Sequence, residues 1–247
     1  MHFAGGPDPF AIEILVMPDT TLIEVAAVIE PLRAANRLAG RRLYDWRIVT
    51  PDGAPATTQA GVPVPAAAAF AAEGGAPLLV LASYGIERHA TRALTARIAR
   101  AGRARPAVIG VEAGSWLMAR AGLLDGRRAT THWEDLEAFA AAFPAVEVVP
   151  ARHVVDGDRV TTGGAGPALD LMLEVIRHRQ GYGLALEVAK AFIYEPAARP
   201  EQAPALAFAR PREPRLARAL GIMEAHMADP LPVERIARQA GVSPRHL

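Results

Sequence analysis

Residues 110–114 read Gly-Val-Glu-Ala-Gly, between a strand-like apolar run (106–111) and a helix-like run (115–121). Gly-x-X-x-Gly is the spacing of a nucleophile elbow, a tight strand-to-helix turn that projects its central side chain into a pocket. A hydrolase built in this way carries Ser or Cys at the centre, whereas this chain carries Glu112 and contains no cysteine. We therefore predict that this turn forms a binding site and does not supply a catalytic nucleophile.

The carboxylate of Glu112 limits what such a site can bind. A partly desolvated carboxylate must meet a cation or hydrogen-bond donors, or be protonated. Trp116 lies one helical turn beyond the elbow, and Trp133 follows a short polar run. Aromatic faces beside a carboxylate favour a quaternary ammonium or guanidinium ligand, and each cation–π contact contributes about 0.5–2 kcal/mol when desolvated. The alternatives are that Glu112 accepts bonds only from loop N–H groups and that both tryptophans pack in the core.

Other polar residues are expected at the same edge of the sheet. Ser83 and Tyr84 follow a buried strand-like run, and Ser115 follows the elbow itself. His132 is either a ligand contact or a hydrogen-bonded structural histidine, because a general base needs a nucleophile beside it. These four residues complete the predicted binding site together with Glu112, the two tryptophans and an early acid.

That early acid is Glu24, which either joins Glu112 as a second carboxylate or lies on a solvated helix face. A Gly-Gly-Ala-Gly stretch at 163–166 precedes a helix-like segment. Backbone N–H groups in such a turn can hold an anion, but the stretch has neither the lysine nor the full spacing of a phosphate loop. A tight turn that lines the pocket is therefore the better interpretation.

Composition excludes several kinds of chemistry. The 247 residues are 51% hydrophobic and 21% charged with a net charge of +1, which is typical of a globular chain. The absence of cysteine excludes disulfides and thiolate sites, and the seven histidines contain no H-x-x-x-H pair. We therefore expect neither a metal nor another cofactor. Because no signal peptide and no 18-residue apolar span are found, we expect a cytoplasmic location.

Strand-like and helix-like segments alternate over the first 180 residues, which predicts an α/β fold with a parallel sheet covered by helices on both faces. The expected strands are residues 11–17, 45–50, 77–82, 107–111, 146–149 and 159–162. The expected helices are residues 22–38, 87–101, 115–121, 134–143 and 167–179. Ligands bind such sheets at the carboxyl ends of the strands, where the elbow also lies. Trp46, inside a strand-like run, is assigned to the core.

The composition changes after Tyr194. Five prolines between residues 195 and 214 exclude one continuous helix and indicate a linker. Helix-like segments follow at 215–228 and 233–240, and they are joined to a third by a turn at Gly241. The helix at 233–240 and the helix that follows the Gly241 turn have the layout of a helix-turn-helix, in which two helices are joined by a short turn that often contains glycine.

Residues 210–247 contain seven arginines and four acidic residues, a local excess of positive charge that is compatible with phosphate contacts. Ser243 is a good N-cap for the third helix, with Pro244 at its first position. The predicted DNA contacts are Ser243, Arg245 and His246. An ordinary helical hairpin on the surface is the alternative.

Several segments resemble the GlxA-type transcriptional regulators. These pair a PfpI-like sensor domain, similar to class I glutamine amidotransferases, with an AraC/XylS-type DNA-binding domain. The most specific match is residues 121–133, Ala-Gly-Leu-Leu-Asp-Gly-Arg-Arg-Ala-Thr-Thr-His-Trp. Similar matches are Glu-Pro-Leu-Arg-Ala-Ala-Asn at 30–36, Gly-Gly-Ala-Gly-Pro-Ala-Leu-Asp at 163–170 and Gly-Val-Ser-Pro-Arg-His-Leu at 241–247. Together the matches extend over nearly the whole chain.

The resemblance implies a flavodoxin-like, PfpI-like sensing domain at 1–194, a Pro-rich linker at 195–214 and the N-terminal part of an AraC-type domain at 215–247. Those last residues correspond to only the first part of its two helix-turn-helix units, so we expect an incomplete all-α domain that binds DNA poorly by itself.

The resemblance also assigns positions at the predicted site. The family's nucleophile position falls on Glu112, its nearby histidine on His132 and its early acid on Glu24. An acid in the elbow is similar to the subgroup that regulates quaternary-amine catabolism and arginine use.

The leading hypothesis from the sequence is a DNA-binding transcription regulator that is not an enzyme and senses a small cationic metabolite near Glu112. Related sensor domains generally pair, so a homodimer is expected, with residues 22–38 as a candidate face. One alternative is a PfpI-like hydrolase or lyase that uses Glu112 in place of cysteine. Another is a sensor domain that has lost its ligand.

Overall fold

The computed structural model describes residues 9–195, 214–226 and 231–244. The chain divides into two compact units, Met1–Pro204 and Ala205–Leu247, which are described separately. Most of the predicted linker, residues 196–213, lies outside the described residues.

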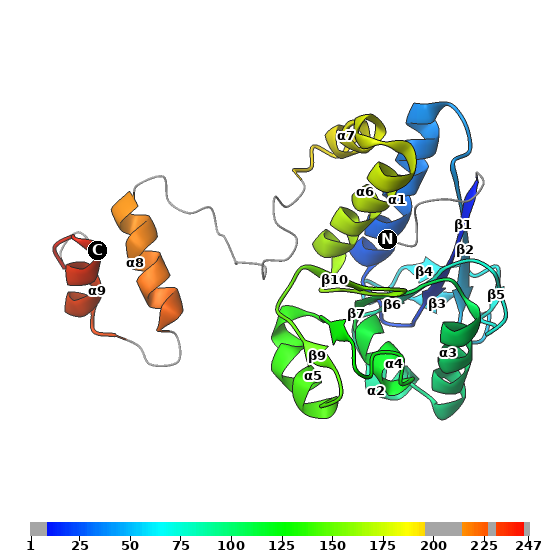
Figure 1. Cartoon of the computed structure of the whole chain (residues 1–247), viewed down its shortest axis with the longest axis horizontal. Helices are drawn as coiled ribbons and strands as arrows, with labels where there is room; N and C mark the ends of the chain where they lie inside the picture. The colour runs from blue at the N-terminus through cyan, green and yellow to red at the C-terminus, as the bar shows by residue number, and fades with distance from the viewer. Residues whose placement is uncertain (1–8, 196–213, 227–230, 245–247) are drawn as a thin grey trace. The chain divides into compact units, whose positions relative to one another are not determined.

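A seven-stranded sheet forms the centre of the first unit (Figure 1). All neighbouring strands pair in parallel except the first two in the order, which are antiparallel. The predicted α/β fold with a parallel sheet is therefore confirmed, apart from the antiparallel pair at one edge, which was not predicted. The order is β10 (His153–Asp156), β11 (Arg159–Thr162), β7 (Val108–Glu112), β6 (Leu78–Ala82), β1 (Phe10–Val16), β2 (Tyr44–Thr50) and β5 (Ala68–Ala69).

Helices cover both faces of this sheet (Figure 1). One face carries three helices that contact one another: α1 (Leu22–Ala39), α6 (Ala165–Gln180) and α7 (Tyr182–Ala191). The other face carries α3 (Arg92–Ala104), α4 (Gly114–Arg120) and α5 (Leu136–Ala142). Parallel strands covered on both faces have to be apolar on both sides, and every residue of β6 is buried accordingly.

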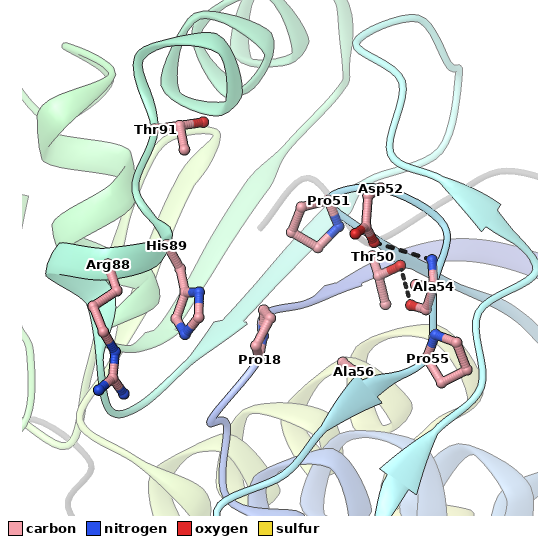
Figure 2. A pocket seen from close by; sticks show the side chains of 10 residues that line it. All are labelled: Pro18, Thr50, Pro51, Asp52, Ala54, Pro55, Ala56, Arg88, His89 and Thr91. Carbon is pink, nitrogen blue, oxygen red and sulfur yellow. Dashed lines mark hydrogen bonds between the residues drawn. The ribbon is translucent and has the colours of Figure 1, made fainter.

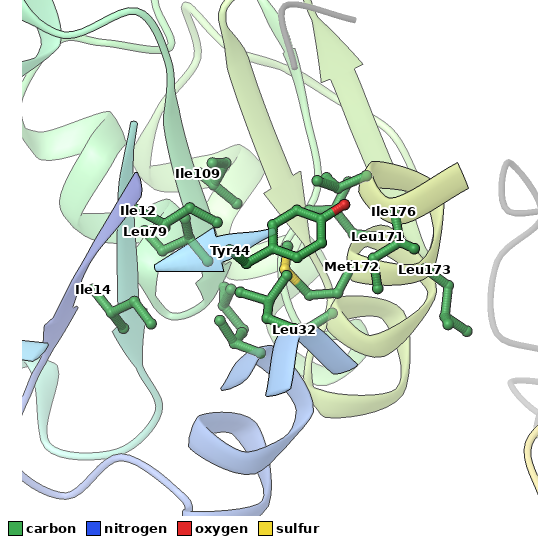
Figure 3. Close-up of a cluster of buried hydrophobic side chains, with 14 of the residues drawn as sticks. Ile12, Ile14, Leu32, Tyr44, Leu79, Ile109, Leu171, Met172, Leu173 and Ile176 are labelled. Atoms are coloured by element: carbon green, nitrogen blue, oxygen red, sulfur yellow. The ribbon is translucent and has the colours of Figure 1, made fainter. Parts of the chain in front are cut away.

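The alternation of side chains along β1 divides the core into two apolar clusters. Ile12 and Ile14 point to the cluster beneath α1 and α6, together with Leu32, Leu171 and others (Figure 3). Leu15 points to the opposite cluster beneath α3 and α4. Each fully buried aliphatic side chain contributes about 1.5–3 kcal/mol relative to an exposed one. The two clusters fix the sheet between its helical layers and thereby fix where the strands end.

The helix predicted over 87–101 is wrong, because the chain forms two helices there. The short helix α2 (Ile86–His89) ends before Thr91, whose side chain accepts a hydrogen bond from the backbone N–H of Leu94 and caps α3. A capping threonine satisfies one of the N–H groups left free at a helix start and so favours a new helix over a continued one.

The segment predicted as a helix over 134–143 begins instead as a 3₁₀ turn, η1 (Trp133–Asp135), followed by α5. The strand predicted at 146–149 exists, but β9 (Glu147–Val148) pairs with β8 (Arg128–Ala129) in a separate two-stranded sheet. A further small pair, β3 (Ala56–Thr57) with β4 (Pro63–Val64), was not predicted, nor were β10 and α7.

The second unit contains α8 (Pro214–Ala225) and α9 (Val233–Ala240), which pack through a small cluster that includes Ala219, Ile236 and Ala240. Gly241 ends α9 in the left-handed conformation with φ of 73°. The third helix predicted from Pro244 falls largely outside the described residues, as do Arg245 and His246. None of the helices in the described part of the chain has the length and apolar character needed to cross a bilayer.

Candidate functional site

The backbone at residues 110–114 has the geometry of an elbow. Glu112 ends β7 with φ of +53°, a left-handed conformation that costs a non-glycine residue on the order of 1 kcal/mol. A Cβ on Gly110 would lie 2.8 Å from the backbone nitrogen of Ser115, and one on Gly114 would collide with the carbonyl oxygen of Val80. Both glycines are therefore needed for the tight packing that holds Glu112 in this conformation.

A second carboxyl group lies beside Glu112. Glu24, in the first turn of α1, is fully buried, so its interpretation as part of a solvated helix face is wrong. The hydroxyl of Ser83 donates to Glu24 Oε2 and accepts in turn from the backbone N–H of Thr21. Within the described residues, Glu24 Oε1 receives no hydrogen bond from a donor.

Burial is the largest influence on the Glu24 carboxyl and, with the adjacent carboxyl of Glu112, raises the pKa of Glu24 to about 10. At neutral pH Glu24 is therefore protonated and can donate a hydrogen bond to the adjacent carboxyl of Glu112. The side chain of Glu112 is only half-buried.

Two other segments close around the Glu112 side chain. Gly164 precedes α6 with φ of +136°, and a Cβ there would lie 3.3 Å from Glu112 Oε2 and 3.8 Å from His132 Cδ2. The hydroxyl of Thr131 donates to the Glu112 backbone carbonyl at 3.2 Å. The glycine-rich turn thus lines the site, as expected.

The two tryptophans of the predicted site have different surroundings. The ring of Trp116 packs edge-on against Phe139 and Phe143, with centroids 5.2 and 5.5 Å away, in the apolar cluster beneath α4. This environment favours a packing role for Trp116. Trp133 is 46% exposed, and its ring lies 5.7 Å from that of His132. It therefore offers an aromatic face next to the histidine that borders Glu112.

The remaining predicted residues are dispersed. His132 Nδ1 lies 3.6 Å from the carboxylate of Glu134, and the His132 side chain is 28% exposed. Tyr84 is mostly exposed, whereas the buried hydroxyl of Ser115 has no hydrogen-bond partner in the described part of the chain. The structure therefore brings Glu24, Ser83 and Glu112 together, with His132 also near Gly164 and Trp133 next to His132. Within the described residues, it shows no hydrogen bond from the side chain of Tyr84 or Ser115 to the carboxyl pair.

Sequence reasoning did not find a charged group just beyond β1. Asp19 has φ of +62°, and its Oδ2 accepts hydrogen bonds from Arg88 at 2.8 Å and from the ring of His89 at 2.9 Å. The bond from His89 is the largest influence that lowers the pKa of Asp19. An aspartate at the carboxyl end of a strand is a signal that could have identified this group.

A hollow of about 240 Å³ lies next to this group, at the carboxyl ends of β1 and β2 (Figure 2). Its lining includes His89, Thr50 and Asp52, but Glu112 does not line it. A second hollow of about 360 Å³ is lined by Trp46, Glu13 and Arg105 among others, and there Trp46 also packs against the core as predicted.

No protein-family model matches the chain. It is 35% identical over 248 residues to the HTH-type transcriptional regulator GbdR of Pseudomonas aeruginosa, covering 97% of this chain and 66% of that protein. It is 33% identical to the regulator CdhR of the same organism, covering 94% of this chain and 70% of CdhR. It is 36% identical to the regulator GlxA of Rhizobium meliloti, covering 96% of this chain and 74% of GlxA.

The chain belongs to this family of HTH-type transcriptional regulators. The resemblance to the GlxA type found in the sequence is thereby confirmed. The chain spans 66% of the length of GbdR, so part of each full-length relative has no counterpart here.

Solved structures show the same fold. A ThiJ/PfpI family protein from Pseudomonas syringae has a TM-score of 0.65 and 24% identity, covering 95% of this chain and 93% of that one. An AraC family transcriptional regulator from Pseudomonas putida has a TM-score of 0.62 and 22% identity, covering 74% of this chain and 100% of that one. A shorter match, 36% identity over 92 residues, relates 36% of the chain to 39% of an isonitrile hydratase from Pseudomonas putida.

Proposed function

We propose that the first unit senses a small cationic metabolite, of the quaternary-amine or arginine-like class, and that the complete protein is a DNA-binding regulator of catabolic genes. The observation that carries this proposal is the carboxyl pair of Glu24 and Glu112. Glu24 keeps its proton at neutral pH, so Glu112 is the acid of the pair that is free to face a ligand at the carboxyl edge of the sheet. A carboxyl group there favours a cation, because in the described residues no ion pair joins Glu112 to a positively charged side chain.

The surroundings of Glu112 suit a bulky cation better than a metal ion. The part of the chain that the structure describes contains no group of three or more His, Asp or Glu side chains arranged to hold a metal. Trp133 provides an aromatic face near His132, and such a face attracts an alkylammonium or guanidinium group. The resemblance to the subgroup concerned with quaternary amines and arginine supports the same class of ligand.

The second unit supports the DNA-binding part of the proposal. The pair α8 and α9, ended by the left-handed Gly241, has the arrangement of the first helices of a helix-turn-helix. We assign residues 1–194 to sensing, 195–214 to a linker and 215–247 to part of the DNA-binding domain. Ser243, Arg245 and His246 are the proposed DNA contacts, and a cytoplasmic homodimer is the proposed working form.

Binding of cations to the chain tests the sensing proposal. Isothermal titration with glycine betaine, carnitine, dimethylglycine and arginine is expected to give binding for at least one compound. Glu112→Gln is expected to weaken that binding about tenfold or more, because the negative charge that attracts the cation is lost. Glu30→Gln, which changes a 41% exposed glutamate of the same helix as Glu24, is the matched control and should leave affinity unchanged.

An isostere that lacks only the positive charge of glycine betaine separates recognition of the cation from recognition of shape. 3,3-Dimethylbutanoate has the shape of glycine betaine with carbon in place of the quaternary nitrogen, so it should bind at least about tenfold more weakly if the cation is recognised. Equal binding of the two compounds, or unchanged affinity in Glu112→Gln, would contradict the proposal, as would the absence of binding by the whole panel.

An enzymatic role is the second candidate, favoured by the left-handed elbow and by the partial match to an isonitrile hydratase. In that case Glu112 would act as base or nucleophile on an amide, aldehyde or nitrile. Turnover of such a substrate by the purified chain that disappears in Glu112→Gln would establish it. The similarity to transcriptional regulators over nearly the whole chain favours the sensing role, because the match to the isonitrile hydratase covers only 36% of the chain.

A further inference from the structure

Tyr194 is held in a polar cluster with Asp170 and Arg152. The Tyr194 hydroxyl donates to Asp170 Oδ1 at 2.9 Å, and Arg152 binds Asp170 Oδ2 through Nε at 2.8 Å and Nη2 at 2.6 Å. The Arg152 Nη2 also lies 3.4 Å from the Tyr194 hydroxyl. Asp170 is buried on α6. We call these three residues the polar cluster.

The polar cluster holds the chain just after α7. After α7, Ile193 takes a left-handed φ of +52° and is almost fully exposed, which turns the chain so that the half-buried Tyr194 packs back toward α6. The hydroxyl of Tyr194 also lies 3.4 Å from the carbonyl oxygen of Gly166, in the first turn of α6. Tyr194 is thus the last side chain anchored on the first unit before the stretch proposed as the linker.

The anchor is a neutral hydrogen-bond donor at physiological pH. Burial and the neighbouring Asp170 raise the pKa of Tyr194 to about 12, so the hydroxyl keeps its proton. Its retention on Asp170 therefore depends on the position of α6 and Arg152 and not on pH.

Arg152 of the polar cluster contacts the glycine-rich turn that lies beside the elbow. The backbone N–H of Gly163 donates to the carbonyl of Arg152 at 2.9 Å, and a Cβ on Gly166 would lie 3.5 Å from Arg152 Nη2. Gly164, which follows Gly163 in the chain, is the residue that approaches Glu112 Oε2. A displacement of the Glu112 side chain would therefore act on the turn at Gly163 and Gly164, which is hydrogen-bonded to the Arg152 carbonyl and leads into α6.

We propose that the polar cluster is a conformational relay that couples the occupancy of the elbow to the anchoring of Tyr194 at the start of the linker. The elbow and Tyr194 are two distinct places joined by α6 and its preceding turn. A ligand at Glu112 that favours one position of this turn then changes the fraction of molecules in which Tyr194 is bound to Asp170. Arg152 and Asp170 act as positioning residues in this relay and do not contact the ligand.

Hydrogen exchange measured by mass spectrometry on the chain tests the relay without a ligand. Exchange in the peptide containing residues 190–195 is compared between wild type and two elbow variants, Glu112→Gln and Gly164→Ala. At least one elbow variant should change the exchange rate there about threefold or more, since residues along such networks alter coupling to this extent. The same elbow variant should have no such effect when combined with Tyr194→Phe or Asp170→Asn, because the anchor is already lost.

Tyr182→Phe is the matched control, because Tyr182 lies on α7 and is 69% exposed. The elbow variants must keep their effect in this background. The relay is overturned if both elbow variants leave residues 190–195 unchanged, or if their effect is the same in Tyr194→Phe as in wild type. A general loss of stability is recognised because it would accelerate exchange in β6 as well.

A second measurement uses glycine betaine and L-arginine as probes at saturating concentration. If either binds, its effect on exchange at residues 190–195 should vanish in Tyr194→Phe while its affinity stays within about twofold, since Tyr194 lies outside the site. A probe that binds and leaves this peptide unchanged overturns the relay but not the sensing proposal. If neither probe binds, the sensing proposal fails for these compounds and the elbow variants still decide the relay.

Discussion

At the scale of single residues, Glu24 is a fully buried acid that keeps its proton at neutral pH. Ser83 donates to one of its oxygens, and the carboxyl of Glu112 lies beside it. Such a group lowers the stability of the folded chain whenever the unfolded chain can ionise it. The carboxyl pair therefore has a measurable signature in the pH dependence of unfolding.

Replacing Glu24 by Gln should raise the melting temperature, and the gain should grow with pH. Below the pKa of about 4.5 that Glu24 has in the unfolded chain, both the folded and the unfolded state hold the proton, so ionisation of Glu24 does not lower the free energy of unfolding there. Between about 4.5 and 10 the unfolded chain loses the proton and the folded chain keeps it, so stability falls as pH rises. Glutamine keeps the hydrogen bonds without titrating. Thermal unfolding from pH 4 to 9 should show a gain of about 5 °C or more at pH 8.

The control for this measurement is Glu30→Gln on the same helix, which should leave the pH profile almost unchanged because Glu30 forms a surface ion pair with Arg33. A difference between Glu24→Gln and wild type that stays constant across the pH range would contradict a protonated Glu24.

At the scale of elements, the turn between β11 and α6 is as constrained as the elbow itself. Gly164→Ala should destabilise the chain by about 1–3 kcal/mol, because φ of +136° excludes a Cβ and Glu112 Oε2 would lie 3.3 Å from it. Urea unfolding gives the difference in free energy. The double variant with Glu112→Ala should regain only the stability lost through the close contact with the Glu112 side chain. The loss that comes from the unfavourable φ at residue 164 should remain, since the backbone conformation is unchanged.

Gly183→Ala is the comparison, because Gly183 lies near the start of α7 and a Cβ there would meet no other atom within 4 Å. Alanine favours a helix over glycine by up to about 1 kcal/mol, so this variant should be equal to or more stable than wild type. An equal loss in both variants would show that the turn at Gly164 has no special constraint.

The break between α2 and α3 has its own test. Thr91→Ala should cost about 1 kcal/mol, because the side chain that caps α3 is lost. Thr95→Ala, one turn further along the same helix, removes a hydroxyl that donates to the Thr91 carbonyl and should cost less. Chemical unfolding of the two variants compares them directly, and a larger loss for Thr95→Ala would be evidence against the cap.

Local patterns predicted some elements well and others poorly for identifiable reasons. β1 and α9 were predicted almost to the residue because their apolar periodicity is regular and they end at turn-forming residues. β10 was missed although Asp156-Gly157-Asp158 is a hairpin signal before β11, with Gly157 at φ of +61°. α7 was missed because its apolar positions continue from α6 after a single glycine, Gly181.

Only those features of the site that lie within one short segment of the sequence could be predicted. The elbow follows from Gly-x-X-x-Gly, whereas the burial of Glu24 depends on Ser83, which is 59 residues away, and on Glu112, which is further still. No short-range pattern contains that information. The packing of Trp116 against Phe139 and Phe143 depends on the position of α5, so local sequence patterns could not predict it either.

At the scale of the whole molecule, the sheet, its six covering helices and both large apolar clusters belong to the first unit. The second unit has only a small cluster around Ile236. A chain that ends at Pro204 should therefore keep the melting transition of the sheet within about 2 °C and should bind the same cations. Calorimetry of the two chains makes the comparison, and loss of the transition on truncation would show that the first unit depends on the second.

The glycines on either side of Glu112 have an evolutionary consequence. The fold excludes side chains at Gly110 and Gly114, whereas the side chain at position 112, midway between them, is only half-buried. The residue at position 112 can therefore be exchanged while the surrounding fold stays the same. Glu112→Cys should fold like the parent and, in a chain without any other thiol, present a single sulfhydryl to alkylating reagents. One codon would then suffice to place a nucleophile at the centre of the elbow.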